Sequence, residues 1–176
     1  MTKAKTVAGL GPIVQLAYVP SDWDASLRYW TETMGVGPFF LFEKLQLEDM
    51  KFKGEPNDAT FTLAIAYWGD VQIELVRAEN DAPAHYNGEY AVHDRLNHVL
   101  ILVDDFAEAE RVVADAGAEV VVSGKFGGGE VMYVDPGAGP GSLVEILKPG
   151  PGGMDMFDMM KAAAQDWDGS DPIRTL

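Results

Sequence analysis

The chain contains an internal repeat, and this repeat limits its fold more than any other feature of the sequence. Residues 14–23 form an apolar run that begins beside Gln15 and ends in an Asp-Trp pair. Residues 97–106 form a similar run that begins beside His98 and ends in an Asp-Phe pair. In both copies an aspartate follows the polar residue by seven positions. A repeated unit of this size predicts two halves with the same fold, packed against each other.

The two copies predict the same order of elements. Each half starts with an apolar strand, over residues 12–19 and 96–103, and continues into a helix. Asp22 or Ser21 is placed to cap the first helix, and Asp105 or its neighbour starts the second. Runs rich in β-branched and aromatic residues predict the remaining strands at 39–47, 60–68 and 71–77, then 120–122, 131–134 and 143–147. The expected fold class is α+β: two tandem βαβββ modules that form a cupped, mostly antiparallel or mixed sheet, followed by a C-terminal helix.

Four segments are expected along the chain. They are a first module at residues 1–77, a linker at 78–95, a second module at 96–149 and a helical tail at 150–176. The linker is polar and lacks periodicity. Its His85 and Tyr86 could contact a substrate, but exposed loop residues are the favoured interpretation. Residues 51–57 carry strong turn chemistry and are expected to form a polar connection within the first module.

The tail combines a flexible joint with a methionine-rich helix. A Gly-Pro-Gly-Gly sequence precedes a helix predicted over residues 154–167. Its Met156, Met159 or Met160, Ala163 and Trp167 share one face, with Phe157 beside them. Such a face packs against the body of its own subunit or of a partner, or it covers an apolar substrate as a lid.

Charge and composition exclude several classes of protein. The formal net charge is −15, which disfavours nucleic acid and anionic lipid surfaces as partners. The chain has no cysteine, so disulfides and thiolate ligands are excluded. No apolar run reaches the roughly 18 residues that a membrane span needs, and the N-terminal residues lack the apolar core of a secretory signal. The expected location is therefore the cytoplasm.

Four polar residues interrupt the apolar strands at matching places in the two halves. Gln15 and His98 lie in the first strand of each half, and Glu74 and Glu145 lie in the last. An unpaired carboxylate buried in a strand is costly, so it must be neutralised, paired or bound to a cation. If the halves are related by a pseudo-twofold axis, the four side chains converge. Such an oxygen and nitrogen set suits Zn²⁺, Ni²⁺, Co²⁺, Mn²⁺ or Fe²⁺.

These motifs resemble the vicinal oxygen chelate superfamily, which includes glyoxalase I, methylmalonyl-CoA epimerase, extradiol dioxygenases and bleomycin-resistance proteins. The resemblance covers nearly residues 10–149 and is closest to the glyoxalase-like group. It implies one metal ligand from the first strand and one from the last strand of each module: Gln15, Glu74, His98 and Glu145. It also implies a homodimer. The ring-cleaving dioxygenases of this superfamily have a metal site of two histidines and one carboxylate. Here the first-strand position is Gln15, which disfavours the dioxygenase activity.

Two functions are compatible with these residues. The first is a metal-dependent isomerase, epimerase or lyase of the glyoxalase type, in which Glu145, or alternatively Glu74, moves a proton next to a metal-chelated carbonyl. The second is a metal-free or non-catalytic protein of the same fold that sequesters a hydrophobic small molecule. The basic residues that would bind a glutathione adduct cannot be located, and the Met-rich tail suggests an apolar substrate.

Overall fold

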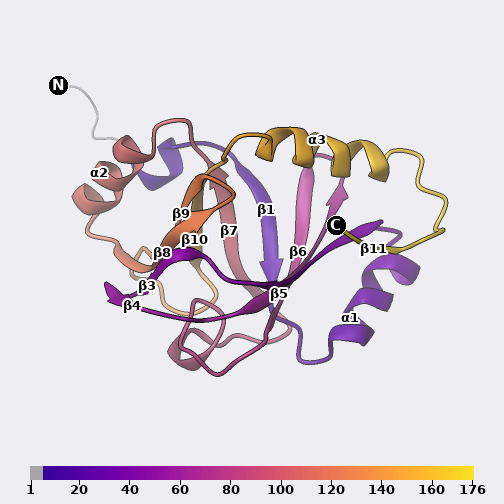
Figure 1. The fold of residues 1–176 in the computed structure, drawn as a ribbon, viewed down its shortest axis with the longest axis horizontal. Helices are drawn as coiled ribbons and strands as arrows, with labels where there is room; N and C mark the ends of the chain where they lie inside the picture. Colours follow the sequence, from indigo (N-terminus) through magenta and orange to yellow (C-terminus); the bar gives the residue numbers. More distant parts are fainter. Residues whose placement is uncertain (1–5) are drawn as a thin grey trace.

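The computed structural model describes residues 6–176, which fold into two βαβββ modules and a tail (Figure 1). The first module contains β1 (Ile13–Tyr18), α1 (Trp23–Arg28) with a π-helical turn (Tyr29–Thr33), β2 (Phe39–Leu45), β3 (Glu48–Phe52), β4 (Glu55–Pro56), β5 (Phe61–Trp68) and β6 (Val71–Ala78). The second contains β7 (Leu96–Leu102), α2 (Phe106–Ala116), β8 (Glu119–Phe126), β9 (Gly129–Asp135) and β10 (Leu143–Lys148). The tail contains α3 (Gly153–Ala164) and β11 (Ile173–Thr175). Short 3₁₀ turns lie at Val7–Gly9 and Gly88–Tyr90.

All strands belong to a single mixed sheet with the order β11-β2-β5-β6-β1-β7-β10-β9-β8-β3-β4. The first strands of the two modules, β1 and β7, pair antiparallel at its centre. Each first strand pairs in parallel with the last strand of its own module, β1 with β6 and β7 with β10. This arrangement is pseudo-twofold about the β1–β7 pair and confirms the predicted fold class.

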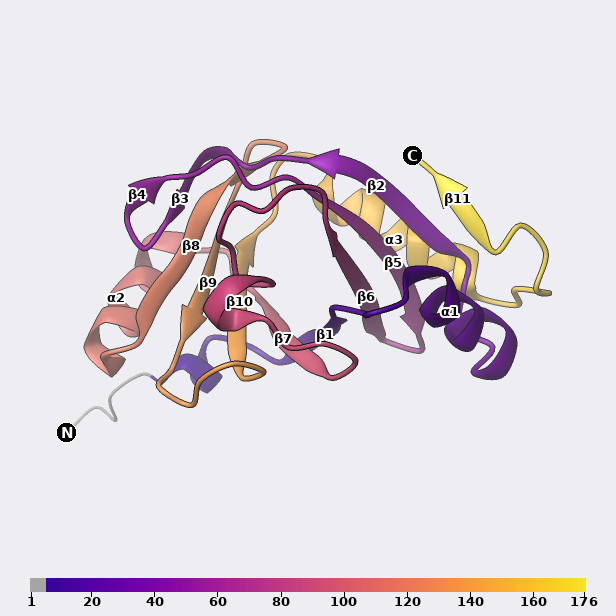
Figure 2. The same cartoon turned by 90° about the horizontal axis from the view of Figure 1, so that it is seen from below.

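The first module also reaches across to the far side of the sheet. β2 pairs with β5 near one end of the strand order, whereas β3, which follows it closely in sequence, pairs with β8 near the other end. Seen from below, the segment from β2 to β4 arches over the hollow of the cup (Figure 2). The polar connection predicted for residues 51–57 is therefore wrong in part, because the end of β3 and all of β4 lie there. β4 pairs with β3, and β3 pairs with β8 of the other module, which local sequence cannot reveal.

The two module helices begin where the sequence predicts. The Asp22 carboxylate accepts a hydrogen bond from Ala25 N, and the Asp105 carboxylate accepts one from Glu108 N, each at 2.9 Å. Each helix packs its apolar face against its own module. Leu27 and Trp30 lie against Ile73 and Leu75, and the equivalent cluster forms around α2. No helix of the described residues is long and apolar enough to span a membrane.

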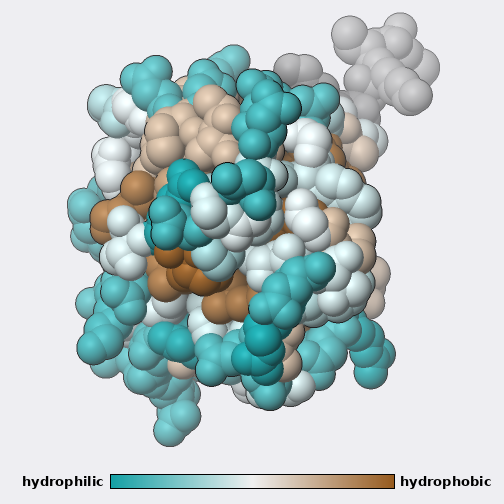
Figure 3. Space-filling view, turned by 90° about the vertical axis from the view of Figure 1, so that its right-hand side faces the viewer, coloured by the Kyte–Doolittle hydropathy of each residue, from teal (hydrophilic) through white to brown (hydrophobic). Residues whose placement is uncertain are grey.

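The tail returns to the first module. α3 packs Phe157 and Met160 against Phe40 and Ile65, as its apolar face predicts, but the helix ends before the predicted residue 167. β11 was not expected, and it adds a parallel edge strand to β2. At this end of the molecule, apolar groups reach the surface among hydrophilic ones (Figure 3).

The linker is not an exposed loop at its centre. His85 and Tyr86 are each only 1% exposed, so the expectation for these two residues is wrong. Both rings pack against Phe61, and His85 also stacks on Tyr133 of the second module. Aromatic contacts from both modules bury this part of the chain although it lacks any periodic pattern.

Candidate metal centre and cavity

Strand alternation places three of the predicted site residues on the concave side of the sheet. Ile73 and Leu75 of β6 are fully buried against the α1 side, so Glu74 between them points to the opposite face. In β10, Ile146 packs in the cluster around α2, and Glu145 before it points into the cup in the same way. His98 lies in β7, between these two strands in the sheet order.

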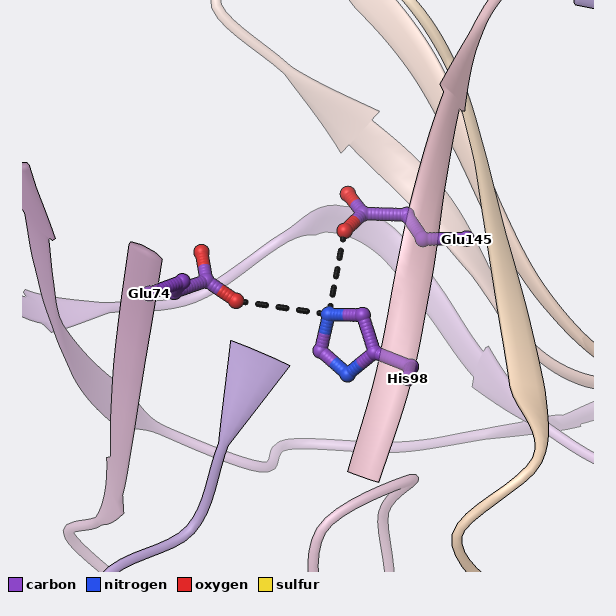
Figure 4. A group of neighbouring side chains, drawn as sticks. All are labelled: Glu74, His98 and Glu145. Atoms are coloured by element: carbon purple, nitrogen blue, oxygen red, sulfur yellow. Dashed lines mark ion pairs between the residues drawn. The ribbon is translucent and has the colours of Figure 1, made fainter. Parts of the chain in front are cut away.

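The three side chains converge on one imidazole nitrogen (Figure 4). His98 Nε2 lies 3.3 Å from Glu74 Oε2 and 3.2 Å from Glu145 Oε2. One potential ligand atom from each residue lies within 4.8 Å of the others, and all three residues are buried. The arrangement presents two carboxylate oxygens and one ring nitrogen to a single point.

Asn97 fixes the orientation of the His98 ring. Its side-chain amide donates to the backbone oxygens of His85 at 3.1 Å and Tyr90 at 3.4 Å, which leaves Asn97 Oδ1 facing the imidazole. His98 Nδ1 lies 2.9 Å from that oxygen and therefore donates to it. Nε2 is then free to bind a metal ion, which is the arrangement that metal-ligating histidines adopt.

Gln15 borders the same cavity as Glu74 and Glu145. Its amide nitrogen donates to Gln72 Oε1 at 2.8 Å, and Gln72 in turn donates to the Tyr67 hydroxyl at 2.7 Å. This chain of hydrogen bonds fixes the Gln15 amide and leaves its Oε1 buried without a partner among the described residues. The structure thus brings Glu74, His98 and Glu145 together and places Gln15 beside them in one cavity.

The electrostatics of the cluster fit a cation. Burial alone would lower the pKa of the His98 imidazole, but the two carboxylates outweigh it and raise that pKa to about 9. Burial raises the pKa of the Glu74 carboxyl, although His98 opposes that shift. Within the described part of the chain, Glu74 Oε2 and His98 Nε2 have no polar partner beyond the ion pairs of the cluster, and Gln15 Oε1 is buried without a hydrogen-bond partner. Two carboxylates and an unpartnered amide oxygen buried at one place are costly unless a cation, either the imidazolium or a bound ion, compensates them.

A cavity of about 250 Å³ opens over the cluster. Gln15, Glu74, Tyr133 and Glu145 supply its polar side chains, and the remaining side chains are apolar. The first module contributes apolar residues of β2 and β5, the second contributes residues of β7, β9 and β10, and α3 closes one side with Met156 and Phe157. The cavity can hold a small organic molecule in contact with the carboxylates.

Tyr133 is a site residue that the sequence analysis missed. It faces Glu145 directly across the β9–β10 pair, and its phenol interacts with that carboxylate. Burial, together with the charges of Glu145 and Glu74, raises the Tyr133 pKa well above its usual range. The equivalent neighbour of Glu74 across β5–β6 is the apolar Ile65. The sequence offered this signal, because pairing the predicted strands 131–134 and 143–147 would place a phenol beside one carboxylate only.

The His85 ring stacks on the Tyr133 ring. The two rings stack in parallel, 3.6 Å apart with 9° between their planes, and His85 also meets the His98 ring edge-on at 5.3 Å. Burial lowers the pKa of His85 well below its usual range, so this ring is neutral. Contact of His85 with the site was only the less favoured interpretation of the linker, because the segment has no periodic pattern that would predict its burial.

The comparisons with known proteins agree with this fold. The sequence model of the glyoxalase/bleomycin resistance protein/dioxygenase superfamily matches residues 14–134, and the chain belongs to this superfamily. Its structure is similar to a hypothetical protein from Bacillus halodurans, with 15% identity, a TM-score of 0.56, and coverage of 78% of this chain and 94% of that one. No curated protein sequence gives a match.

Two methylmalonyl-CoA epimerases have similar structures. The Mycobacterium tuberculosis protein is 13% identical with a TM-score of 0.52, over 85% of this chain and 94% of its own. A Streptomyces coelicolor variant in complex with 2-nitronate-propionyl-CoA is 15% identical with a TM-score of 0.53, over 79% of this chain and 94% of its own. At these identities the likeness establishes the shared fold.

Proposed function

We propose that this protein is a divalent-metal-dependent isomerase or epimerase, or a lyase of the same type, that moves a proton at a carbon next to a carbonyl group. The observation that carries the proposal is the convergence of His98 Nε2 with the Glu74 and Glu145 carboxylates, buried at the base of a ligand-sized cavity. Epimerases among the proteins with a similar structure support it.

Gln15, Glu74, His98 and Glu145 would hold the ion through one nitrogen and three oxygen donors, a set that suits Zn²⁺, Ni²⁺, Co²⁺, Mn²⁺ or Fe²⁺. When bound, such an ion polarises a carbonyl oxygen and stabilises the negative charge that develops on it. Asn97 keeps His98 Nε2 available by accepting from Nδ1. The apolar walls exclude water from the carbon that loses its proton.

Glu145 is the proposed base. Its carboxylate borders the cavity, where a substrate carbon can approach within hydrogen-bond distance. The Tyr133 phenol interacts with Glu145 and orients it, whereas Ile65 gives Glu74 no such partner. The two carboxylates therefore differ in their surroundings: both face His98 Nε2, but only Glu145 also has a phenol as its cross-strand neighbour.

Solvent-deuterium exchange tests this assignment. A panel of hydroxy-ketones, thiohemiacetals and acyl thioesters is incubated with metal-loaded protein in D₂O, and label on carbon is measured by mass spectrometry. We expect exchange with at least one compound, and loss of at least about 100-fold in Glu145→Gln, since a positioned base contributes on that order. Glu130→Gln is the matched control, because Glu130 pairs with Lys148 at 3.2 Å outside the cluster. Full exchange in Glu145→Gln would transfer the role of base to Glu74.

A second function is favoured by the apolar walls of the cavity. A protein of this fold that sequesters a hydrophobic small molecule needs no base and no metal. A wild-type protein that catalyses no exchange across the panel and carries no divalent metal at full stability would support this alternative. The homodimer and the cytoplasmic location expected from the sequence stay predictions, to be checked by sedimentation equilibrium and cell fractionation.

A further inference from the structure

We infer that the substrate of this site is an uncharged, largely apolar molecule enclosed by α3, and that Met156 limits its size. This inference rests on the proposed function, because it assigns the ligand of the same cavity. Three independent properties of the walls support it: their charge, their volume and the contribution of the tail.

The charge of the cavity disfavours an anion. Among the described residues no lysine or arginine borders it, and its only acidic side chains are those of Glu74 and Glu145. A divalent ion held by these two carboxylates would balance their charge and leave no net attraction for a negatively charged substrate. An uncharged carbonyl compound brings no charge of its own into the cavity. The ion would then stabilise the negative charge that develops on the carbonyl oxygen during proton transfer.

Three lysines on elements that border the cavity have ion-pair partners. Lys148, at the end of β10, pairs with Glu130 at 3.2 Å, and Lys161 of α3 pairs with Asp70 at 2.7 Å. Lys125 of β8 pairs with Asp49 at 2.7 Å. Each of these ammonium groups has a carboxylate partner, and none of the three side chains borders the cavity.

The volume of the cavity limits how much of a substrate it can enclose. About 250 Å³ is below the roughly 300–1,000 Å³ of pockets that take drug-sized ligands. A substrate that is fully enclosed is therefore small, and the nucleotide of a CoA ester would have to stay outside. Around the carboxylates the substrate would meet side chains such as Phe42, Leu63 and Leu147.

α3 supplies the wall opposite the sheet, beyond the residues that match the superfamily. Met156 and Phe157 border the cavity, while Met160 anchors the helix with 1% exposure. Phe157 is also part of the packed cluster with Phe40 and Ile65, so its position is fixed. Met156 is only partly buried, and its flexible side chain is the element of this wall that can adjust to a ligand.

Two fluorescent probes with one ring skeleton separate charge from shape. N-phenyl-1-naphthylamine is uncharged, and 1-anilinonaphthalene-8-sulfonate carries a sulfonate on the same skeleton. We expect the uncharged probe to bind the wild-type protein at least about tenfold more tightly, because burying an unpaired anion is costly. Equal or tighter binding of the sulfonate, or no binding of either probe, would overturn the inference.

Variants of α3 locate the bound probe. Met156→Phe should weaken binding of the uncharged probe at least about fivefold by filling the cavity. Met156→Leu, which changes the volume little, should bind the probe as the wild-type protein does. Met159→Phe is the matched control, since Met159 lies on the same helix, is 42% exposed and does not border the cavity. An equal effect of Met156→Phe and Met159→Phe would contradict the assignment. Circular dichroism of each variant checks that the fold is retained.

The result is independent of catalysis. If the protein binds the uncharged probe selectively but exchanges no compound, the proposed reaction is contradicted and the proposed ligand class is supported. Exchange confined to acyl thioesters of CoA, with no binding of the uncharged probe, would keep the reaction and remove the ligand class.

Discussion

His98 is the only nitrogen donor among the four candidate ligands, and residues on both sides of the ring determine its state. Asn97 accepts from Nδ1, while Glu74 and Glu145 face Nε2. Without a metal ion, these carboxylates favour the imidazolium and raise the pKa of His98 to about 9. A metal ion at Nε2 would replace that proton, so protonation and metal binding compete at one atom.

This competition predicts the pH dependence of metal-free protein. The folded-state pKa of His98, about 9, lies above its ordinary value of 6.5, so its stabilisation is present below pH 6.5 and is lost as the pH rises through 9. The free energy of unfolding of EDTA-treated protein should therefore fall between pH 7 and pH 9. The pKa of His85 is lowered, so its contribution changes at lower pH and does not affect this window.

Urea denaturation followed by circular dichroism at several pH values measures this change. Adding Zn²⁺ should reverse the trend, because metal binding strengthens as protons leave the ligands. A stability of the metal-free protein that stays constant or rises from pH 7 to pH 9 would contradict the charged environment described for His98.

At the scale of elements, the tail depends on a close approach between two turns. Gly150 precedes α3, and a Cβ atom at this position would collide with the backbone of the β8–β9 turn, at Gly127 and Gly129. Phe126 and Gly127 of that turn border the cavity, as do residues 149–153. The contact of the two turns therefore sets both the start of α3 and one edge of the cavity.

Gly150→Ala tests this contact. The added methyl group must push two backbone segments apart, so we expect a loss of about 1–3 kcal/mol in the free energy of unfolding, as for other overpacked sites. Gly9→Ala is a control in which the added Cβ meets its nearest neighbour at an ordinary 3.4 Å. Denaturant titration that finds the same stability for both variants would show that the turns can separate freely.

At the scale of the whole molecule, the repeat predicted the fold class, because two copies of one unit with the same order of elements give two similar modules. It also singled out Glu74 and Glu145, at equivalent places in the two halves, which lie in one buried cluster with His98. It could not predict that β3 pairs with β8, that β11 pairs with β2, or that His85 is buried. Those features depend on contacts between distant segments that have no local pattern of their own.

The central claim is that one divalent ion binds where the two modules meet, and metal titration tests it most directly. Isothermal titration of EDTA-treated, dialysed protein with Zn²⁺ should give about one site per chain, with affinity at least about 100-fold weaker in His98→Ala. His93→Ala, at an exposed histidine outside the cluster, should bind as the wild type does. Equal affinity in His98→Ala and wild-type protein would contradict the claim.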